Sequence, residues 1–318
     1  MIEELKKIDI IIVNWNSGGY LQDCLNSLTN ITNKLFSIDR VCIVDNCSMD
    51  GSLSKIDTID LPLKLIKNSS NKGFAVACNL GAKDSNADYL LFLNPDARIF
   101  EKSLEESIKF MEHPDNSKVG VCGIQLLDEL DTVARSCSRL LSVPILVAEA
   151  TGLSKLLPRF FPSQFMIEWD HQNTQDVEEV IGAFFLVRKE VFELLNGFDE
   201  QFFVYYEEVD FCYRLRENGF RVSYLSTAQA FHKGGGTSDN VKAHRLFYSL
   251  RSRILYIRKH FDLFNTFIAI GTTLMIEPIS RIIFGIIKIS PSSVSETVIG
   301  YLMLYKWLIQ IALASNKK

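Results

Sequence analysis

The feature that most constrains the fold is an alternation, over the first two thirds of the chain, of short β-branched runs with amphipathic segments. This order is typical of βαβ units around a largely parallel sheet. The predicted strands are 8–14, 40–45, 63–67, 89–93 and 119–124. Apolar residues at helical spacing predict crossover helices at 20–28, 74–84 and 104–111. Because polar residues follow each strand, a ligand site is expected at the carboxyl ends of the strands.

The middle of the chain is less regular. Between about 138 and 174 the periodicity is poor and three prolines occur, which predicts loop and irregular helix, a plausible acceptor-side insertion. Regular structure returns with predicted strands at 180–188 and 221–225 and predicted helices at 189–195 and 210–217.

The composition changes again beyond Gly236. A helix rich in Arg and Lys is predicted over 244–260, followed by two strongly apolar stretches, 263–289 and 298–314. Charged residues interrupt both stretches, so neither is a clean membrane span. A basic helix followed by such segments suits a protein lying in a membrane interface. The alternative is a helical pair packed on the main domain or on a partner.

The charge and the cysteine content of the chain indicate which classes of protein it can belong to. The chain of 318 residues has a formal net charge of −4 and 23% charged residues, so nothing in its charge indicates a nucleic-acid partner. Seven cysteines are scattered without metal-like spacing, and the first residues lack the apolar stretch of a secretory signal. These observations predict a globular enzyme with unpaired thiols in a reducing, cytosolic compartment.

Two motifs in the first third suit the binding of a nucleotide. Asp45 ends a strand and can accept hydrogen bonds from a base or a ribose, and the turn after it leads to a helix start that favours an anion. Asn71, Lys72 and Gly73 precede a helix that carries Asn79; the glycine permits close approach and the lysine adds charge for phosphate. Each motif alone also suits an ordinary capped turn or helix start.

Two further motifs suit a metal ion. Asn94 and Asp96 follow an apolar strand, where a carboxylate can hold a hard divalent cation that in turn binds a diphosphate. His232 and the glycine run after it follow the last strand of the domain; a neutral imidazole can complete a metal site with Asp96, and the glycines let a loop fold over phosphates. The alternatives are a turn with Asp96 as a helix cap and an ordinary surface histidine.

A cluster of acids lies further along the chain. Glu207, Glu208 and Asp210 fall within four positions, so they repel one another unless a cation, an arginine or an acceptor proton is close. A solvated acidic helix start is the alternative. The aromatic residues before the cluster argue against that alternative.

Taken in order, these motifs resemble family 2 of the inverting glycosyltransferases, most closely its rhamnosyltransferase-like members, over roughly 8–260. The matching segments are IVNWN at 12–16, VDNCSMDGS at 44–52, NKGFAVACNLG at 71–81, LFLNPD at 91–96, GAFFLVRKEVF at 182–192, GFDEQFFVYYEEVDFCYRLRENG at 197–219 and FHKGGGTS at 231–238. The resemblance implies a GT-A fold of the α/β class, with a Rossmann-like mixed, mostly parallel sheet flanked by helices and a C-terminal helical membrane-associating extension. The expected domains are a catalytic domain at 1–240, with a nucleotide-sugar half at 1–125 and an acceptor half at 126–240, and a basic and apolar helical region at 241–318.

The resemblance also implies roles for individual residues. Glu208 matches the catalytic base in the second place of an E-D-x-D motif, with Glu207 and Asp210 in supporting or acceptor-side places. Asp96 ends the metal-binding D-x-D signature, and His232 matches a histidine that joins the metal. The positions expected to bind the nucleotide sugar are Asn14, Asn16, Asp45, Asn71, Lys72, Gly73, Asn79 and Asn94. The chain departs from the family pattern in having Asn94 as the first residue of D-x-D and glutamate at 208.

The activity that the resemblance implies is one inverting displacement at an anomeric carbon, with a nucleotide-diphosphate sugar as donor and Mn²⁺ or Mg²⁺ as cofactor. The favoured donor is dTDP-L-rhamnose, with UDP-sugars second, and the expected acceptor is a lipid-linked or cell-surface glycan. The expected location is the cytoplasmic face of the inner membrane, as a peripheral or monotopic protein.

Two other classes remain as alternatives. A nucleotidyltransferase would have a glycine-rich and basic loop after the first strand, but no Arg or Lys lies between Asn14 and Lys34. An inactive membrane scaffold would have no reason to retain Asp45, Asp96, Glu208 and His232 together.

Overall fold

The computed structural model describes residues 5–29, 31, 33–54, 56–235 and 241–315. The chain forms two compact units. The first contains Met1–Leu140, Phe165–Phe203 and Glu207–Thr237, and the second contains Leu141–Gln164, Val204–Tyr206 and Ser238–Lys318.

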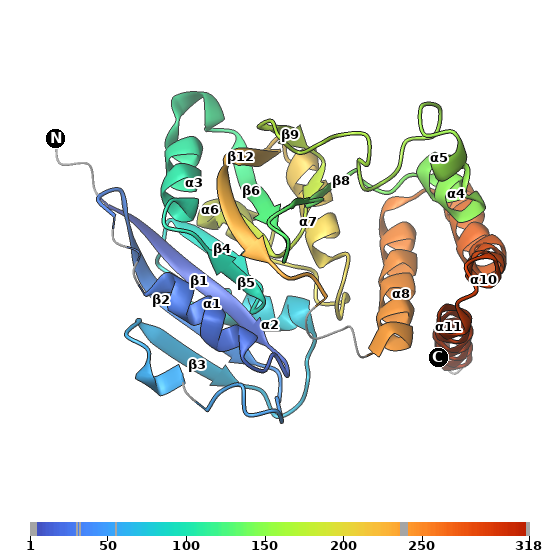
Figure 1. The fold of residues 1–318 in the computed structure, drawn as a ribbon, viewed down its shortest axis with the longest axis horizontal. Helices are drawn as coiled ribbons and strands as arrows, with labels where there is room; N and C mark the ends of the chain where they lie inside the picture. Colours follow the sequence, from blue (N-terminus) through green and yellow to red (C-terminus); the bar gives the residue numbers. More distant parts are fainter. Residues whose placement is uncertain (1–4, 30, 32, 55, 236–240, 316–318) are drawn as a thin grey trace. The chain divides into compact units, whose positions relative to one another are not determined.

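The first unit is built on a ten-stranded sheet in the order β3-β2-β1-β4-β11-β6-β12-β5, with β7 and β9 added at β6 and β12 (Figure 1). Its strands are β1 Lys6–Asn14, β2 Phe36–Asp45, β3 Leu63–Lys67, β4 Tyr89–Leu93, β5 Ala97–Ile99, β6 Val119–Leu127, β7 Val133–Ala134, β9 Gln175–Val177, β11 Phe184–Arg188 and β12 Arg221–His232. β1 to β4 pair in parallel, as do β6 and β12, whereas β11 is antiparallel to β4 and β6. The prediction of a mixed, mostly parallel sheet is therefore confirmed.

Helices cover both faces of this sheet. α1 (Tyr20–Leu28) and α3 (Ser103–Glu112) share one core with Ile10 and Ile12 of β1. α2 (Phe74–Ala82), α6 (Lys189–Leu194) and α7 (Glu207–Glu217) share the other core, which contains Ile11. A strand buried on both faces reads as a continuous apolar run rather than as an alternation, which is the pattern of β1. Each such side chain contributes about 1.5–3 kcal/mol when fully buried.

Several elements differ from their predicted form. β12, predicted to end at 225, continues to His232, so this histidine ends the strand instead of following it. The predicted strand 180–188 is two strands, because β10 (Glu179–Val180) leaves the large sheet to pair with β8 (Cys137–Ser138) before β11 begins. The helix predicted from 210 begins at Glu207, where acidic side chains favour the positive end of the helix dipole. β5 was not predicted, since a three-residue strand is stable only through its pairing with β12.

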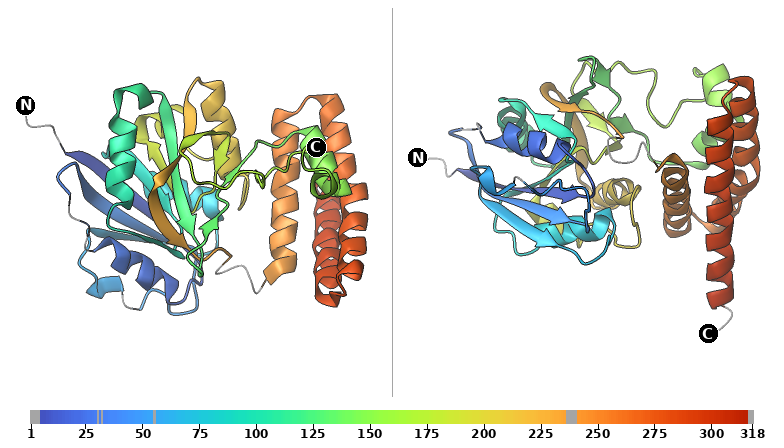
Figure 2. Two further views of the ribbon diagram at one scale, coloured as in Figure 1. Left: turned by 45° about the horizontal axis from the view of Figure 1, so that its top comes forward. Right: turned by 60° about the horizontal axis from the view of Figure 1, so that its bottom comes forward.

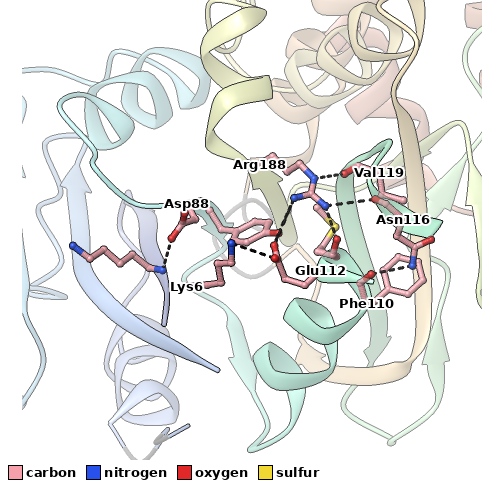
Figure 3. Close-up of polar contacts among 10 residues, drawn as sticks. Lys6, Asp88, Phe110, Glu112, Asn116, Val119 and Arg188 are labelled. Carbon is pink, nitrogen blue, oxygen red and sulfur yellow. Dashed lines mark hydrogen bonds and ion pairs between the residues drawn. The ribbon is translucent and has the colours of Figure 1, made fainter. Parts of the chain in front are cut away.

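Arg188 fastens α3 to the edge of the sheet where β4 begins and β11 ends (Figure 3). Its guanidinium donates to the carbonyl oxygens of Val119 (2.9 Å) and Met111 (2.5 Å) and to the hydroxyl of Tyr89 (2.9 Å). Glu112 of α3 lies 3.7 Å from the same group and also accepts from the Tyr89 hydroxyl. One buried cation thus joins three strands to the end of a helix, opposite the polar carboxyl ends of the parallel strands.

The second unit is helical, and its long helices run side by side (Figure 2). Its elements are α4 Val143–Thr151, α5 Leu153–Leu156, α8 Lys242–His260, α9 Leu263–Gly271, a π-helical segment Thr272–Ile276, α10 Glu277–Ile287 and α11 Pro291–Ser315. α8 and α11 form a small core around Phe247, Leu250, Ile254, Tyr301 and Leu304. The predicted basic helix is α8, and the two apolar stretches lie in α9 to α11. The predicted boundary of a catalytic domain at residue 240 stays a prediction.

Candidate functional site

Asn14 and Asp45 form a hydrogen-bonded pair at the carboxyl ends of β1 and β2. They are direct neighbours in the register of the two strands and are 0% and 4% exposed. The Asn14 amide donates to Asp45 Oδ1 (2.8 Å) and to the Ser52 hydroxyl (2.9 Å), while the Ser48 N–H donates to Asp45 Oδ2 (3.1 Å). The predicted nucleotide-binding turn is therefore rigid, and its carboxylate is oriented on both sides.

Asn16 and Gly73 shape the backbone around this turn. Asn16 has φ +50° and accepts a hydrogen bond from the Met49 N–H (2.8 Å). Gly73 has φ +91°, and a Cβ at this position would lie 2.4 Å from the Phe203 carbonyl oxygen, so only glycine fits. Asn71 caps the turn by accepting from the Gly73 N–H (2.9 Å). The turn at 71–73 is thereby held against the segment that leads to α7.

Two of the residues expected at the nucleotide sugar have different surroundings. Lys72 is exposed beside the start of α2, where its charge is available to an anion. The Asn79 amide is already bonded to the backbone of Phe198, donating to its carbonyl oxygen (2.8 Å) and accepting from its N–H (3.0 Å). Asn79 thus holds the 197–199 turn in place, and its contact with a donor stays a prediction.

Asp96 and His232 are brought together by the pairing of β5 with β12, in which His232 lies opposite Ala97. His232 Nε2 is 3.4 Å from Asp96 Oδ1, and their side chains are 11% and 9% exposed. Nε2 is buried and has no hydrogen-bond partner among the residues that the structure describes. A buried acceptor nitrogen beside a carboxylate suits two adjacent ligands of one cation, which are about 3 Å apart when the bonds are about 2.1 Å. The two residues therefore fit the predicted divalent cation.

The surroundings of Asp96 leave room for further ligands. Within the described residues no group of three His, Cys, Asp or Glu side chains could enclose a metal ion, so a donor diphosphate would have to supply the others. A pocket of about 170 Å³ adjoins Asp96. It is lined by Tyr20, Asp23, Asp96, Arg98, Glu129, Phe231 and Lys233. Asn94, two positions before Asp96, is half-buried. Gly236, Thr237 and Ser238 of the motif that begins at His232 lie outside the described residues.

The acids at the start of α7 differ in their surroundings. Glu207 is 4% exposed and Glu208 is half-buried; the Oε2 atom of each has no hydrogen-bond partner in the described part of the chain. Asp210 is fully buried and pairs with Arg214 (Nε to Oδ2, 2.7 Å), which also donates to the Leu195 carbonyl oxygen (2.7 Å). Asp210 thus has a positioning role, and the two glutamates remain as acids available to a substrate.

Burial controls the protonation of this pair. It raises the pKa of Glu208, while N–H groups of Gly182 and Val209 stabilise the Glu208 carboxylate and oppose that rise. Burial and the charge of Glu208 hold the pKa of Glu207 well above its usual range. Glu208 is therefore the better candidate for a carboxylate that accepts a proton. The helix starts at Glu207, so both glutamates lie in its first turn, and sequence position alone does not separate them.

Sequence reasoning missed Glu179 and Arg98. Glu179 lies in β10 and is only 2% exposed; its one signal in the sequence is an acidic residue at the head of an apolar strand. Arg98 stacks on the Phe231 ring (4.0 Å to its centroid) beside Asp96. No pattern in the sequence marks either Glu179 or Arg98 as part of the site.

Comparison with known proteins gives the family. The model of glycosyl transferase family 2 matches residues 9–195. The hexosyltransferase Agl10 of low-salt glycan biosynthesis in Haloferax volcanii is 23% identical over 79% of this chain and 75% of its own length. The N-acetylglucosaminyl-diphospho-decaprenol L-rhamnosyltransferase of Mycobacterium tuberculosis is 24% identical over 80% of this chain and 85% of its own length.

A solved structure is similar over nearly the whole chain. The mannosyltransferase PcManGT from Pyrobaculum calidifontis, solved with GDP-Man and Mn²⁺, has a TM-score of 0.56 at 14% identity and covers 98% of this chain and 81% of its own. This likeness confirms the GT-A fold class. Since the family model spans more than half of the residues, the chain belongs to glycosyl transferase family 2.

Proposed function

We propose that this glycosyltransferase moves a sugar from a nucleotide-diphosphate donor to a hydroxyl group with inversion at the anomeric carbon. The observation that carries the proposal is the close pair of Asp96 and His232, which follows β4 and ends β12 in the same sheet in which Asp45 ends β2. Glu208 supplies a carboxylate that no ion pair within the described residues neutralises.

Each residue of the proposed site has a separate role. Asp45, fixed by Asn14, binds the nucleoside, and Lys72 attracts the phosphates. Asp96 and His232 would hold Mn²⁺ or Mg²⁺, which when bound neutralises charge on the diphosphate. Glu208 accepts the proton of the acceptor hydroxyl as the hydroxyl oxygen bonds to the anomeric carbon. The bond from that carbon to the diphosphate oxygen breaks, and its electron pair leaves with the diphosphate.

The favoured donor is dTDP-L-rhamnose, because an L-rhamnosyltransferase is among the relatives that match most of the chain. A UDP-sugar is the second candidate. The favoured acceptor is a glycan carried on a lipid diphosphate, which is the kind of substrate named for the same relative. The buried acids and the paired histidine disfavour an inactive scaffold, since each costs stability unless a ligand uses it.

Binding of the donor tests the metal proposal. We expect calorimetry to detect binding of dTDP-rhamnose or UDP-sugars only with Mn²⁺ or Mg²⁺, and EDTA to abolish transfer. Asp96→Ala should weaken binding at least tenfold while the fold is retained, because a direct ligand is lost. The control is Asp115→Ala, which removes a carboxylate that is 89% exposed. Equal binding of the donor by Asp96→Ala in metal-free buffer would rule out the metal role.

We also propose that the second unit attaches the enzyme to the cytoplasmic face of the inner membrane. The helical segments Leu263–Ile287 and Pro291–Ala314, of 25 and 24 residues, are long and apolar enough to cross a membrane by length and composition. Only 22% of an 18-residue apolar stretch within each segment is buried. The exposed apolar side chains include Leu263, Phe264, Phe267, Met275, Ile279, Ile283, Ile286, Ile287, Leu302, Ile309 and Leu313. An apolar surface of this extent is typical of membrane or protein contact.

The charges that interrupt the first apolar stretch are neutralised inside the unit. Glu277 is 6% exposed and pairs with Arg253 of α8 (2.6 Å) and with Arg281 (2.7 Å). Lys155 and Lys288 lie over the Phe284 ring, at 4.5 and 4.6 Å from its centroid, so their ammonium groups border the apolar surface. An inward ion pair and bordering lysines suit helices that lie in one leaflet, where long basic side chains reach the headgroups.

A further inference from the structure

A third glutamate, Glu179, lies in the same buried region as the acids at the start of α7. It opposes Ser138 in the β8–β10 pair, and the Ser138 hydroxyl donates to Glu179 Oε2. β10 packs against α7, and Glu208 is the neighbouring charge that acts on Glu179. Three residues after Glu179, the Gly182 N–H donates to Glu208. One short segment thus carries a buried acid and also orients the candidate base.

Among the residues that the structure describes, no cation pairs with this group of carboxyls. None of the ion pairs in the described part of the chain includes Glu179, Glu207 or Glu208, and Arg216 of α7 pairs with Glu178 instead (3.8 Å). Like charges repel strongly in a buried site, so the three groups cannot all be ionised at once. Hydrogen bonds to a carboxylate favour its charged form. Glu208 accepts from backbone N–H groups, so the negative charge resides there and Glu179 keeps its proton.

The other titratable groups in this region are neutral near pH 7 to 8. They are Cys137 on β8, Cys212 on α7, Tyr224 on β12 and Cys78 on α2. Burial raises the pKa of each of these side chains. Burial and the charge of Glu208 hold the pKa of Glu207 well above its usual range. Apart from Glu207, Glu179 is therefore the group whose ionisation would add a second charge beside Glu208.

We propose that Glu179 is a positioning residue for Glu208: as a neutral carboxylic acid it leaves Glu208 as the single charge of the group, held against the Gly182 N–H. This inference rests on the proposed role of Glu208 as the base. Burial and the charge of Glu208 raise the pKa of Glu179 to about 8. Above that pH two carboxylates repel each other, and Glu208 loses its position.

The test compares pH profiles of kcat. Glu179→Gln reproduces the neutral acid at every pH, so it retains kcat within about twofold of wild type at pH 7 and lacks the fall that wild type shows above about pH 8. Glu178→Gln is the matched control, because it removes the adjacent carboxylate, whose side chain is 43% exposed, and it keeps the wild-type profile. An alkaline fall of equal size in Glu179→Gln overturns the proposal. So does a loss of more than tenfold at pH 7 in a folded Glu179→Gln, since the ionised form would then be required.

Infrared difference spectra separate this inference from the proposed activity. The spectrum of wild type minus that of Glu179→Gln should contain the C=O band of a protonated carboxyl at pH 7. This band should disappear as the pH rises, with the midpoint of its loss near pH 8. In Glu208→Gln the midpoint moves to lower pH, because the neighbouring charge is gone. Absence of the band, or an unchanged midpoint in Glu208→Gln, overturns the inference even in an active enzyme. If the band is normal but the protein transfers no sugar from any donor, the proposed function is refuted. The inferred coupling of Glu179 to Glu208 then still holds.

Discussion

At the scale of single residues, Glu208 and Glu207 differ in exposure and in hydrogen bonding, although they adjoin in the sequence. Glu208 is half-buried and accepts backbone N–H groups, whereas Glu207 is enclosed and its pKa is held well above its usual range. The base in an inverting transfer must be ionised and reach the acceptor. Glu208, which is the more exposed of the two and accepts backbone N–H groups, is therefore the proposed base.

Substitution of the two glutamates therefore should give different results. We expect Glu208→Gln to lower kcat by about a hundredfold to ten-thousandfold, the usual loss when a general base is removed. Donor binding by calorimetry should be unchanged, because the base faces the acceptor. Glu207→Gln should retain most of kcat, since a group that is already protonated loses little when it becomes an amide. A larger fall in Glu207→Gln than in Glu208→Gln would assign the base to Glu207 instead.

The assignment of Glu208 as the base also predicts how kcat changes at acidic pH. Burial raises the pKa of Glu208. The base is therefore active above its raised pKa, and activity is lost as the pH falls through that value. We expect this loss in wild type at a pH above the ordinary glutamate value of about 4.3.

At the scale of elements, the stability of the sheet depends on the contacts that Arg188 makes at the edge far from Asp45. Its side chain is 15% exposed and joins β11, β6 and β4 to the end of α3. Removing it leaves the carbonyl oxygens of Val119 and Met111 without this donor, whereas Glu112 keeps its contacts with Lys6 and Tyr89. The packing of α3 on β6 and β12 depends on the same contacts.

We expect Arg188→Met to lower the free energy of unfolding by about 1–3 kcal/mol, the usual cost of leaving buried acceptors without their donor. The ion pair with Glu112 adds little to this, because the Glu112 side chain is 36% exposed. Arg221→Met is the control, because the side chains of Arg221 and its partner Asp176 are 38% and 49% exposed and such a pair contributes about 0–1 kcal/mol. Urea unfolding followed by circular dichroism measures both variants. Equal losses in the two would show that the Arg188 contacts add nothing beyond a surface pair.

At the scale of the whole molecule, the apolar surface of the second unit should determine where the enzyme resides. Leu263 and Phe267 are 90% and 80% exposed on α9. Burial of such side chains contributes about 1.5–3 kcal/mol each, so their joint replacement should weaken membrane binding roughly a hundredfold. Basic residues add only about 1 kcal/mol each near an anionic surface.

Flotation with anionic phospholipid vesicles tests this expectation. Wild type should float even at high salt, whereas Leu263→Glu combined with Phe267→Glu should remain in the soluble fraction. Leu130→Glu is the control, since it places the same charge at an apolar residue that is 81% exposed in the first unit. A full-length wild type that stays soluble and monomeric beside the vesicles would favour helices packed within the protein instead.

Local pattern was enough to predict most of the elements of this protein. Strand β4 and strand β3 were predicted with the observed bounds, because short apolar or β-branched runs between turn residues define a strand without reference to the rest of the chain. Asn14 and Asp45 end two of the predicted strands, and parallel strands end at one edge of a sheet, where the structure brings the two residues into contact.

Other features depend on contacts between distant parts of the chain. The three-residue β5 exists only through its pairing with β12, and that pairing brings His232 to Asp96. The proximity of Glu179 to Glu208 likewise depends on the packing of β10, which pairs with β8, against α7. Periodicity reports how a residue relates to its own element, but it holds no information on which elements meet. The sequence by itself thus determined the family, the sheet and the acids Glu207, Glu208 and Asp210. Only the tertiary structure brought the buried Glu179 near them, because that proximity depends on β10 packing against α7.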